Sequence, residues 1–378
     1  MKLEDFLATK ELFYKDIDYD FFPSVWEKVS SKFTIPKIIH IIGTNGKGST
    51  GRFLSYYLYK AGFDTGHYSS PHINKFNERI WLNGHDASDE ILEDAHKRLL
   101  PKLDSDILEK LSYFEYTTLL AMEVFCKCNY VVLEAGLGGE YDATNVFEKL
   151  FTLVTPIGVD HQSFLGDSIE EIAKTKLRSI TTYAIMTWQK EEVFRVADTL
   201  DIKYFLAKDF FTKEELQDIK DFIIQNDFAT YLTQNLTLAL SAVKKLNLEY
   251  DINFLKGIEL KGRFQKISKN ITVDVGHNKQ AALAIKQELK DKKIVLIYNT
   301  YKDKDFKEIL TILKPNIKKV LIIDIEGERV VDHDRLETVL DELDIYHDKF
   351  DIKNLGDENY LVFGSFLVVE KFLKLYNS

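Results

Sequence analysis

The stretch that decides the fold reads Ile38-Ile39-His40-Ile41-Ile42-Gly43-Thr44-Asn45-Gly46-Lys47-Gly48-Ser49-Thr50. Its apolar start predicts a buried strand, and the glycine-rich turn leads toward a helix over Phe53–Tyr59. Glycines let several backbone N–H groups face one anion, and the helix N-terminus and Lys47 add positive charge. The strict P-loop spacing G-x4-G-K-[ST] is absent, because the first two glycines are closer and a glycine follows the lysine. Strand, turn, lysine and helix still occur in the required order, which favours a phosphate-binding loop over an ordinary turn.

Short apolar runs alternate with amphipathic stretches along the rest of the chain, and this alternation predicts parallel α/β sheets. The predicted strands are Ile38–Ile42, Tyr130–Leu133, Thr152–Ile157, Ile271–Val275, Ile294–Tyr298, Val320–Ile325 and Tyr360–Phe363. The predicted helices are Phe53–Tyr59, Thr117–Phe125, Ala229–Leu246, Lys279–Leu289 and Phe306–Leu313. The interval Thr181–Phe228 shows no clear pattern and stays unassigned.

A length of 378 residues suggests two domains. A long helical stretch ends before residue 260 and a new set of strands follows. We therefore predict a P-loop-type parallel-sheet ATPase domain over residues 1–260, followed by a smaller Rossmann-like α/β domain over residues 261–378.

The composition narrows the classes of partner. Lys plus Arg number 50 and Asp plus Glu number 60, so the net charge is −10, which disfavours binding to nucleic acid or anionic membranes. Cys126 and Cys128 are one residue apart and fit neither a redox pair nor a zinc site. The first residues are acidic and show no apolar leader, so we expect a cytoplasmic protein. We also expect a monomer whose partners are small molecules.

Two further predicted strands end in polar groups. Glu134 follows Tyr130–Leu133, and a carboxylate beside a phosphate loop is where a Mg²⁺ ligand belongs, although an acid at a strand end is as often simply solvated. Asp160 and His161 follow the strand over Thr152–Ile157. Such a pair is usually structural, and a neutral imidazole is an uncommon ligand of Mg²⁺.

Taken together and in order, the motifs resemble the folylpolyglutamate synthase/dihydrofolate synthase family, which belongs to the Mur ligase superfamily. The resemblance runs from about residue 38 to 280, and Phe363-Gly364-Ser365 is similar to the family's C-terminal strand. The motifs that carry it are Gly43–Ser49, Ser69–His72, Phe76–Ile80, Leu133–Gly139, Asp142–Asn145, Gly158–His161, Phe164–Asp167, Gly262–Phe264 and Asp274–Asn278.

This resemblance implies an ATP-dependent amide ligase that adds L-glutamate to dihydropteroate, to folates, or to both, through an acyl phosphate. A carboxylate is a poor acylating agent because hydroxide is a bad leaving group, and phosphorylation supplies a better one. Lys47 and Mg²⁺ would screen the charge between two anions. Closure of two domains would exclude water from the acyl phosphate.

The resemblance also implies roles for individual residues. The implied ATP-binding residues are Asn45, Gly46, Lys47, Gly48, Ser49, Asn235 (near the adenine), Arg263 and Asp274. The implied metal ligands are Ser70, Glu134 and His161. The implied catalytic residues are Lys47, His161, Lys176 and His277, and the implied substrate contacts are Arg79, Asp142, His277 and Ser365.

Lys176 matches a lysine that the family carboxylates on its side-chain nitrogen, which turns a cation into an anionic metal ligand. The sequence departs from the family pattern nearby, because Leu-Arg-Ser-Ile follows Lys176 where Ala-Gly-Ile is usual. Glu140 stands where the family usually has Arg, before Asp142–Asn145. A plain solvated helix lysine is therefore the alternative interpretation of Lys176.

Three other functions fit the sequence less well than the folate ligase does. A Mur-type peptidoglycan-precursor ligase carries a nucleotide-sugar domain before its phosphate loop, and only 42 residues precede Gly43. A P-loop nucleotide-binding regulator without ligase activity would not need the cluster of Arg263, Asp274 and His277. A nucleic-acid ATPase is disfavoured because the chain is acidic and lacks a basic stripe.

Overall fold

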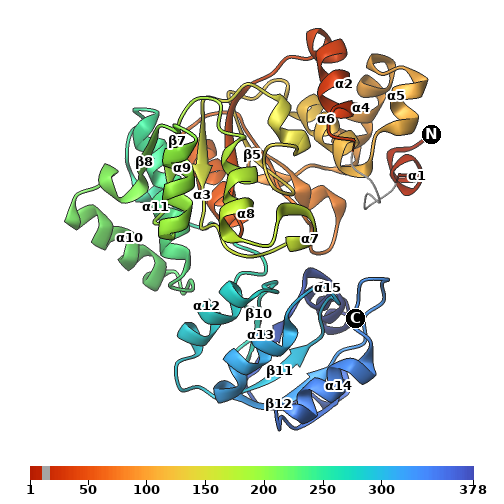
Figure 1. The fold of residues 1–378 in the computed structure, drawn as a ribbon, viewed down its shortest axis with the longest axis vertical. Helices are drawn as coiled ribbons and strands as arrows, with labels where there is room; N and C mark the ends of the chain where they lie inside the picture. Colours follow the sequence, from red (N-terminus) through yellow and green to blue (C-terminus); the bar gives the residue numbers. More distant parts are fainter. Residues whose placement is uncertain (11–17) are drawn as a thin grey trace. The chain divides into compact units, whose positions relative to one another are not determined.

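The computed structural model describes residues 1–10 and 18–378. Within these residues the chain forms two compact units. The first comprises Met1–Ile219 and Gln234–Ile258, and the second comprises Lys220–Thr233 and Glu259–Ser378. Each unit is an α/β structure built on one mostly parallel sheet, which confirms the predicted fold class (Figure 1).

The sheet of the first unit has the strand order β4-β3-β2-β5-β1-β6-β7-β8. Its strands are β1 (Lys37–Ile42), β2 (Thr65–Tyr68), β3 (Ile80–Leu82), β4 (His85–Asp86), β5 (Tyr130–Glu134), β6 (Phe151–Val154), β7 (Ala184–Met186) and β8 (Tyr204–Leu206). All neighbours pair in parallel except at β3 and β4, which are antiparallel. Strand β1 lies between β5 and β6, so the loops after these three strands meet at one edge.

Helices flank this sheet, and helices α10 and α11 contain the points where the chain passes from one unit to the other. The helices are α1 (Leu3–Ala8), α2 (Phe21–Val29), α3 (Lys47–Lys60), α4 (Asp89–Leu99), α5 (Ser105–Lys110), α6 (Tyr113–Phe125), α7 (Gln162–Leu165), α8 (Ile169–Leu177), α9 (Glu191–Thr199), α10 (Lys213–Gln225) and α11 (Leu232–Lys245). Short 3-10 turns are η1 (Ser30–Lys32), η2 (Phe76–Arg79), η3 (Leu100–Lys102), η4 (Ala143–Val146), η5 (Ala207–Phe210) and η6 (Ile252–Leu255).

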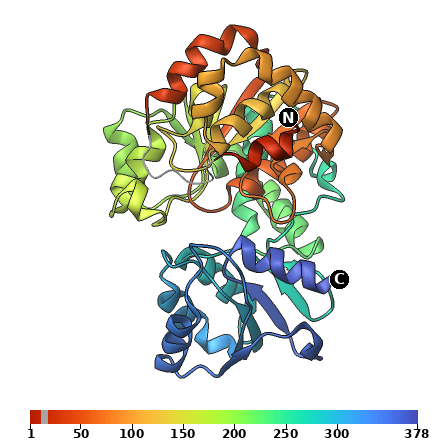
Figure 2. The ribbon, with the colours of Figure 1, turned by 90° about the vertical axis from the view of Figure 1, so that its right-hand side faces the viewer.

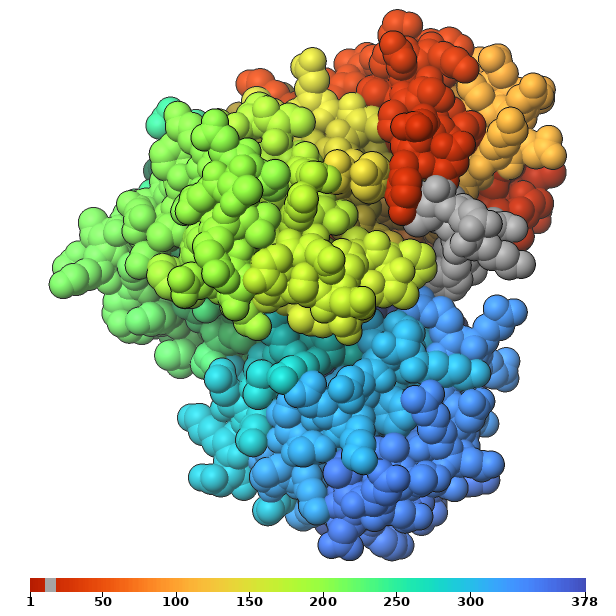
Figure 3. All heavy atoms as spheres, viewed as in Figure 1, coloured from red at the N-terminus to blue at the C-terminus, as the bar shows by residue number. Residues whose placement is uncertain are grey.

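The core of the first unit follows from the alternation of side chains along the strands. Ile38 and Leu133 pack in one apolar cluster with residues of α2, α4 and α6. The red and orange helices of this part of the chain lie in the upper part of Figure 2. Ile42 and Val154 pack in another cluster with residues of α8 and α9. In the space-filling view, the yellow-green segment that contains these two helices covers much of the visible face of this unit (Figure 3).

The second unit has a sheet with the order β13-β12-β11-β14-β10-β9, parallel except for β9. Its strands are β9 (Gln265–Lys266), β10 (Ile271–Val273), β11 (Ile294–Tyr298), β12 (Ile317–Ile322), β13 (His347–Lys349) and β14 (Tyr360–Phe363). Its helices are α12 (Lys279–Leu289), α13 (Phe306–Leu313), α14 (His333–Glu342) and α15 (Phe366–Tyr376), with the 3-10 turns η7 (Lys314–Asn316) and η8 (Ile352–Asn354). Its apolar core joins α12, α13 and α14 to the central strands.

Some predicted boundaries were wrong. Helix α3 begins at Lys47 and not at Phe53, because its polar first turn carries no apolar periodicity. Strand β6 ends at Val154, before the predicted Ile157. The unassigned interval Thr181–Phe228 holds two three-residue strands, β7 and β8, which are too short to give a pattern. No helix in the described residues is long and apolar enough to cross a membrane.

Candidate active site

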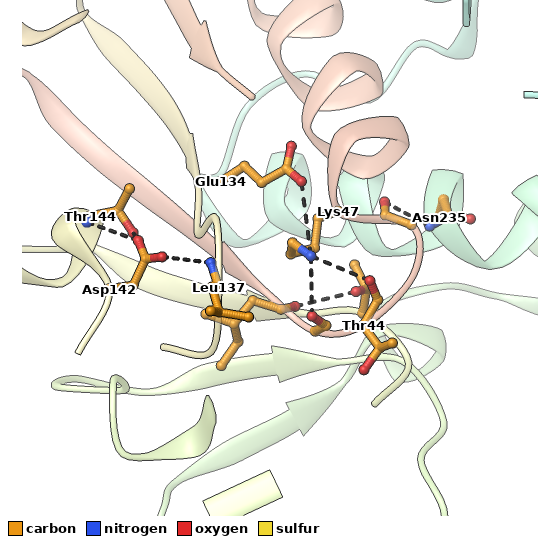
Figure 4. Close-up of polar contacts among 11 residues, drawn as sticks. Thr44, Lys47, Glu134, Leu137, Asp142, Thr144 and Asn235 are labelled. Carbon is orange, nitrogen blue, oxygen red and sulfur yellow. Dashed lines mark hydrogen bonds and ion pairs between the residues drawn. The ribbon is translucent and has the colours of Figure 1, made fainter. Parts of the chain in front are cut away.

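The glycine-rich loop joins the carboxyl end of β1 to α3, and the side chain of Lys47 folds back over it. The Nζ atom of Lys47 donates to the carbonyl oxygens of Gly43 and Thr44, each at 3.3 Å. It also lies 4.0 Å from Oε1 of Glu134, the last residue of the neighbouring strand β5 (Figure 4). The structure therefore places the predicted cation and the predicted carboxylate side by side at one edge of the sheet.

Contacts from distant parts of the first unit hold this loop. The hydroxyl of Thr44 accepts from the backbone N–H of Gly158 and donates to its carbonyl oxygen, both at 2.9 Å. Asn235 of α11 donates through Nδ2 to the carbonyl of Gly46 at 3.0 Å and to Oγ1 of Thr50 at 3.1 Å (Figure 4). Asn235, which was expected near the adenine, therefore contacts the phosphate loop itself.

The predicted ATP-binding residues Asn45, Gly48 and Ser49 lie in this loop and in the first turn of α3. The hydroxyl oxygen of Ser49 is buried and makes no hydrogen bond with any described residue. A buried hydroxyl costs free energy unless a ligand or water satisfies it. Ser49 therefore offers a buried hydroxyl that a ligand or a water molecule would satisfy.

Asp142 is buried beside the loop that follows β5. Its Oδ2 accepts from the backbone N–H of Leu137 at 2.7 Å, and its Oδ1 accepts from the N–H and the hydroxyl of Thr144 at 3.0 and 2.5 Å (Figure 4). Burial raises the pKa of Asp142, while the hydrogen bonds from Thr144 and Leu137 and the charge of Lys47 oppose that rise. Three protein donors thus occupy a carboxylate that was predicted to contact substrate.

Lys176 lies near the end of α8 and is buried. Burial and, to a smaller extent, the charge of Lys47 lower the pKa of Lys176 to about 7, although Asp160 and Asp142 oppose the shift. Lys176 is therefore brought within electrostatic range of the phosphate loop. A buried amine with this pKa is largely uncharged slightly above neutral pH.

The remaining predicted residues of the first unit follow strands at the same sheet edge. Ser70 lies in the loop after β2. Arg79 donates through Nε to Nδ1 of His72 at 2.9 Å, and its guanidinium lies 5.2 Å from the ring centre of Tyr113. His161 lies in the segment after β6, directly before α7, and has a positive φ of 53°.

In the second unit, Asp274 follows β10 and accepts three hydrogen bonds. Its Oδ2 accepts from the hydroxyl of Tyr231 at 2.7 Å and from the N–H of Phe264 at 2.8 Å, and its Oδ1 accepts from the N–H of Gly276 at 2.7 Å. Burial raises the pKa of Asp274, and the charge of Arg263 opposes that rise. The carboxylate of Asp274 therefore holds the backbone at Phe264 and at Gly276.

The other predicted residues of the second unit gather at the start of α15. The guanidinium of Arg263 and the ring of His277 lie 5.6 and 6.4 Å from the ring centre of Phe366. Ser365 caps α15, because its hydroxyl accepts from the N–H of Val368 at 3.2 Å. Each unit thus holds its own group of the predicted site residues.

Sequence reasoning missed several residues that hold these sites. Thr144, His40 and Leu137 support Asp142, whereas Tyr231 and Phe366 support the group in the second unit. Thr144 lies inside the motif Asp142–Asn145. Its hydroxyl can both donate and accept a hydrogen bond, and this was the signal that could have revealed its role. Leu137 also lies inside a recognised motif, but it contributes only its backbone N–H, which no side-chain pattern reveals. No local pattern marks His40, Tyr231 or Phe366.

A parallel sheet with a phosphate loop, a lysine and a neighbouring acid defines a nucleotide-dependent enzyme, and the second α/β unit is typical of the ATP-dependent ligases. The chain is 31% identical over 364 residues to the dihydrofolate synthase/folylpolyglutamate synthase of Haemophilus influenzae, covering 85% of this chain and 82% of that protein. The chain belongs to the dihydrofolate synthase/folylpolyglutamate synthase family, and it is an ATP-dependent ligase. No family model matches it.

Solved structures agree with this assignment. The crystal structure of Helicobacter pylori folylpolyglutamate synthetase superposes with a TM-score of 0.78 at 39% identity, covering 99% of this chain and 98% of that one. A bifunctional folylpolyglutamate synthase/dihydrofolate synthase solved with Mn, AMPPNP and L-glutamate bound gives a TM-score of 0.83 at 23% identity, covering 100% and 98%. At 23% identity, the similarity to this second structure shows only a shared fold.

Proposed function

We propose that this ligase adds L-glutamate to dihydropteroate, to folates, or to both, and that an acyl phosphate carries the energy of ATP to the new amide bond. The observation that carries the proposal is the position of Lys47, inside a glycine-rich loop at the edge of a parallel sheet and 4.0 Å from Glu134. A cation held by backbone carbonyls at a helix N-terminus suits a triphosphate.

In this proposal, the N–H groups of Asn45, Gly46, Gly48 and Ser49 bind the triphosphate, and Lys47 neutralises the charge that moves during transfer. An oxygen of the pterin substrate's carboxylate attacks the γ-phosphorus, and the bond to the β–γ bridging oxygen breaks to release ADP. The amino group of glutamate then attacks the carbonyl carbon. Phosphate leaves, the nitrogen loses a proton, and an amide remains.

The residues present fit a hard divalent cation. Mg²⁺ prefers oxygen ligands and commonly takes only one or two from the protein when phosphates supply the rest. Glu134 and the buried hydroxyl of Ser49, together with Ser70, offer such oxygens, and His161 would add a less usual nitrogen. A Mg²⁺ ion held there would supply positive charge that offsets the charge of the phosphates. No cluster of three His, Cys, Asp or Glu side chains in residues 1–10 and 18–378 could by itself hold a metal.

We further propose that Lys176 is carboxylated on its side-chain nitrogen. Only the uncharged amine adds to carbon dioxide, and a pKa near 7 leaves a substantial uncharged fraction at neutral pH. The nitrogen lone pair forms the N–C bond, one N–H proton goes to water, and the carbamate keeps a negative charge. That charge would suit a position beside Lys47 better than a buried ammonium does.

The second unit would supply the remaining contacts. Arg263 and Asp274 would meet the nucleotide, and His277 and Ser365 would meet glutamate, while Arg79 and Asp142 serve the pterin substrate in the first unit. In this scheme residues 1–260 form the ATP- and pterin-binding domain, and residues 261–378 form the glutamate-ligase domain, which adds contacts to the nucleotide. We also propose a monomer that works in the cytoplasm on small molecules.

One assay tests the proposal: release of phosphate from ATP, measured with dihydropteroate or tetrahydrofolate, each with and without L-glutamate. We expect release only when ATP, a pterin carboxylate and glutamate are all present, with a new amide detected by mass. Phosphate release without either acceptor, or ATP binding without turnover, would indicate a nucleotide-binding regulator. The ratio of the two pterin rates defines the substrate class.

A further inference from the structure

A chain of buried hydrogen bonds runs from the central strand to the loop after β5. His40 lies in the middle of β1 and is fully buried. Its Nε2 lies 2.8 Å from the hydroxyl oxygen of Thr144, which is 2.5 Å from Oδ1 of Asp142. The other oxygen of Asp142 accepts from the N–H of Leu137 in the loop after β5.

The direction of each bond follows from counting hydrogens. Three donors meet the two oxygens of Asp142, so this carboxylate acts only as an acceptor. The single hydroxyl hydrogen of Thr144 is therefore used toward Asp142. Toward His40 the same oxygen has only a lone pair to offer, and Nε2 of His40 must carry the hydrogen.

The other nitrogen of the ring supports this assignment. Nδ1 of His40 is buried and has no hydrogen-bond partner among the described residues. A bare lone pair there costs less than an N–H without an acceptor, and a cationic ring would bury a charge near Lys149 as well. Burial lowers the pKa of His40 well below its usual value, and Lys149 lowers it further.

We infer that His40 is a positioning residue. As the neutral Nε2–H tautomer it orients the hydroxyl of Thr144, this hydroxyl orients Asp142, and Asp142 holds Leu137 in the loop that follows Glu134. Strand β1 thereby fixes the loop that follows the neighbouring strand β5. The role in turnover rests on the proposed function, whereas the tautomer does not.

The first test needs no activity. Proton–nitrogen correlation spectra of protein with labelled histidine report which ring nitrogen carries hydrogen, and the signal missing from His40→Gln identifies His40 among nine histidines. We expect the Nε2–H form, unchanged by His85→Gln, an exposed control. An Nδ1–H or doubly protonated ring at neutral pH would overturn the proposal.

The second test uses turnover. Thr144→Val removes the shared hydroxyl, and we expect kcat/KM for the pterin substrate to fall on the order of 10²-fold, because small misplacements near a reacting centre are costly. Thr144→Ser should restore most of the rate, KM for ATP should change much less, and adding His40→Leu to Thr144→Val should cost little more. A folded Thr144→Val enzyme with the wild-type rate, or fully additive losses, would refute the relay. An inactive wild-type enzyme would instead refute the proposed function and leave the spectroscopic test decisive.

Discussion

Glu140 and Arg178 form an ion pair, with 3.3 Å between Oε2 and Nη1. These are two positions at which the sequence departs from the family pattern: an acid replaces the usual Arg before Asp142, and an Arg follows Lys176 closely. The backbone N–H of Glu140 also donates to the carbonyl of Thr175 at 2.9 Å. The two departures therefore contact each other and tie the end of α8 to the loop that carries Asp142.

The pair predicts a modest coupling. Its side chains are 42% and 26% exposed, so Arg178→Ala and Glu140→Ala should each lower the free energy of unfolding by about 1 kcal/mol or less. Exchange of the two charges in Glu140→Arg/Arg178→Glu should recover part of the loss. Urea unfolding of the wild type, the two single alanine variants and Glu140→Ala/Arg178→Ala gives the coupling energy, with the more exposed pair Arg195 and Glu170 as the matched control. A coupling above about 2 kcal/mol would contradict this assessment.

Lys47→Ala should nearly abolish turnover. The ammonium group is the positive charge that backbone carbonyls hold inside the loop, and loss of such a preorganised group costs on the order of 10²-fold or more in kcat. Steady-state phosphate release measures the effect, and Lys60→Ala, at the exposed end of the same helix, is the control. An enzyme of near-normal rate after Lys47→Ala would refute the assignment of this loop.

Glu134→Gln should weaken the dependence on Mg²⁺. The change keeps the shape of the side chain but removes the negative charge that lies 4.0 Å from Lys47, so a divalent cation is held less tightly. A Mg²⁺ titration of the rate at saturating ATP should shift to higher concentration, whereas Glu27→Gln on the exposed side of α2 should not shift it. An unchanged titration for Glu134→Gln would exclude a role for this carboxylate as a ligand.

Lys176 predicts a specific pH dependence of stability in carbonate-free buffer. Its pKa is about 7 in the folded protein and near 10.5 when exposed, so between these values the unfolded chain binds more protons. The free energy of unfolding should therefore rise with pH in this window, by at most about 1.4 kcal/mol per pH unit, and the cost of burying the ammonium is complete below pH 7. Lys176→Met should flatten the rise, and Lys174→Met, exposed on the same helix, should not.

The same lysine predicts a labile modification. With bicarbonate present above pH 7, native mass spectrometry should show the mass of one carbon dioxide added to the wild type, lost on acidification and absent from Lys176→Met. An unmodified wild-type mass under these conditions would leave a plain buried amine.

Gly46→Ala should lower the free energy of unfolding by more than backbone strain alone would. Gly46 has a φ of +92°, and a Cβ there would lie 2.0 Å from Nδ2 of Asn235. Gly62 has nearly the same φ, +91°, with no atom within 4 Å of a Cβ. Gly62→Ala should therefore cost about 1–2 kcal/mol of stability, the usual strain of this conformation, and leave ATP affinity unchanged. Gly46→Ala should cost more stability than this, and calorimetry should show weaker ATP binding. Equal effects of both changes would contradict the packing role of Asn235.

The sequence by itself determined the α/β alternation and the glycine-rich turn at the end of the first sheet strand, and it marked Lys47 and Glu134 as polar residues at strand ends. These features are local: each depends on residues within one strand and the turn after it, where periodicity and glycine positions carry the information. Motifs in the right order were sufficient to point to the family.

Only the tertiary structure decided how these side chains behave. The low pKa of Lys176 arises because α8 packs on the sheet and removes water from the amine. The contact of Asn235 with Gly46 and the relay from His40 to Asp142 join residues far apart along the chain. Desolvation and hydrogen bonds of this kind depend on which surfaces meet after folding, and no local pattern of residues encodes them.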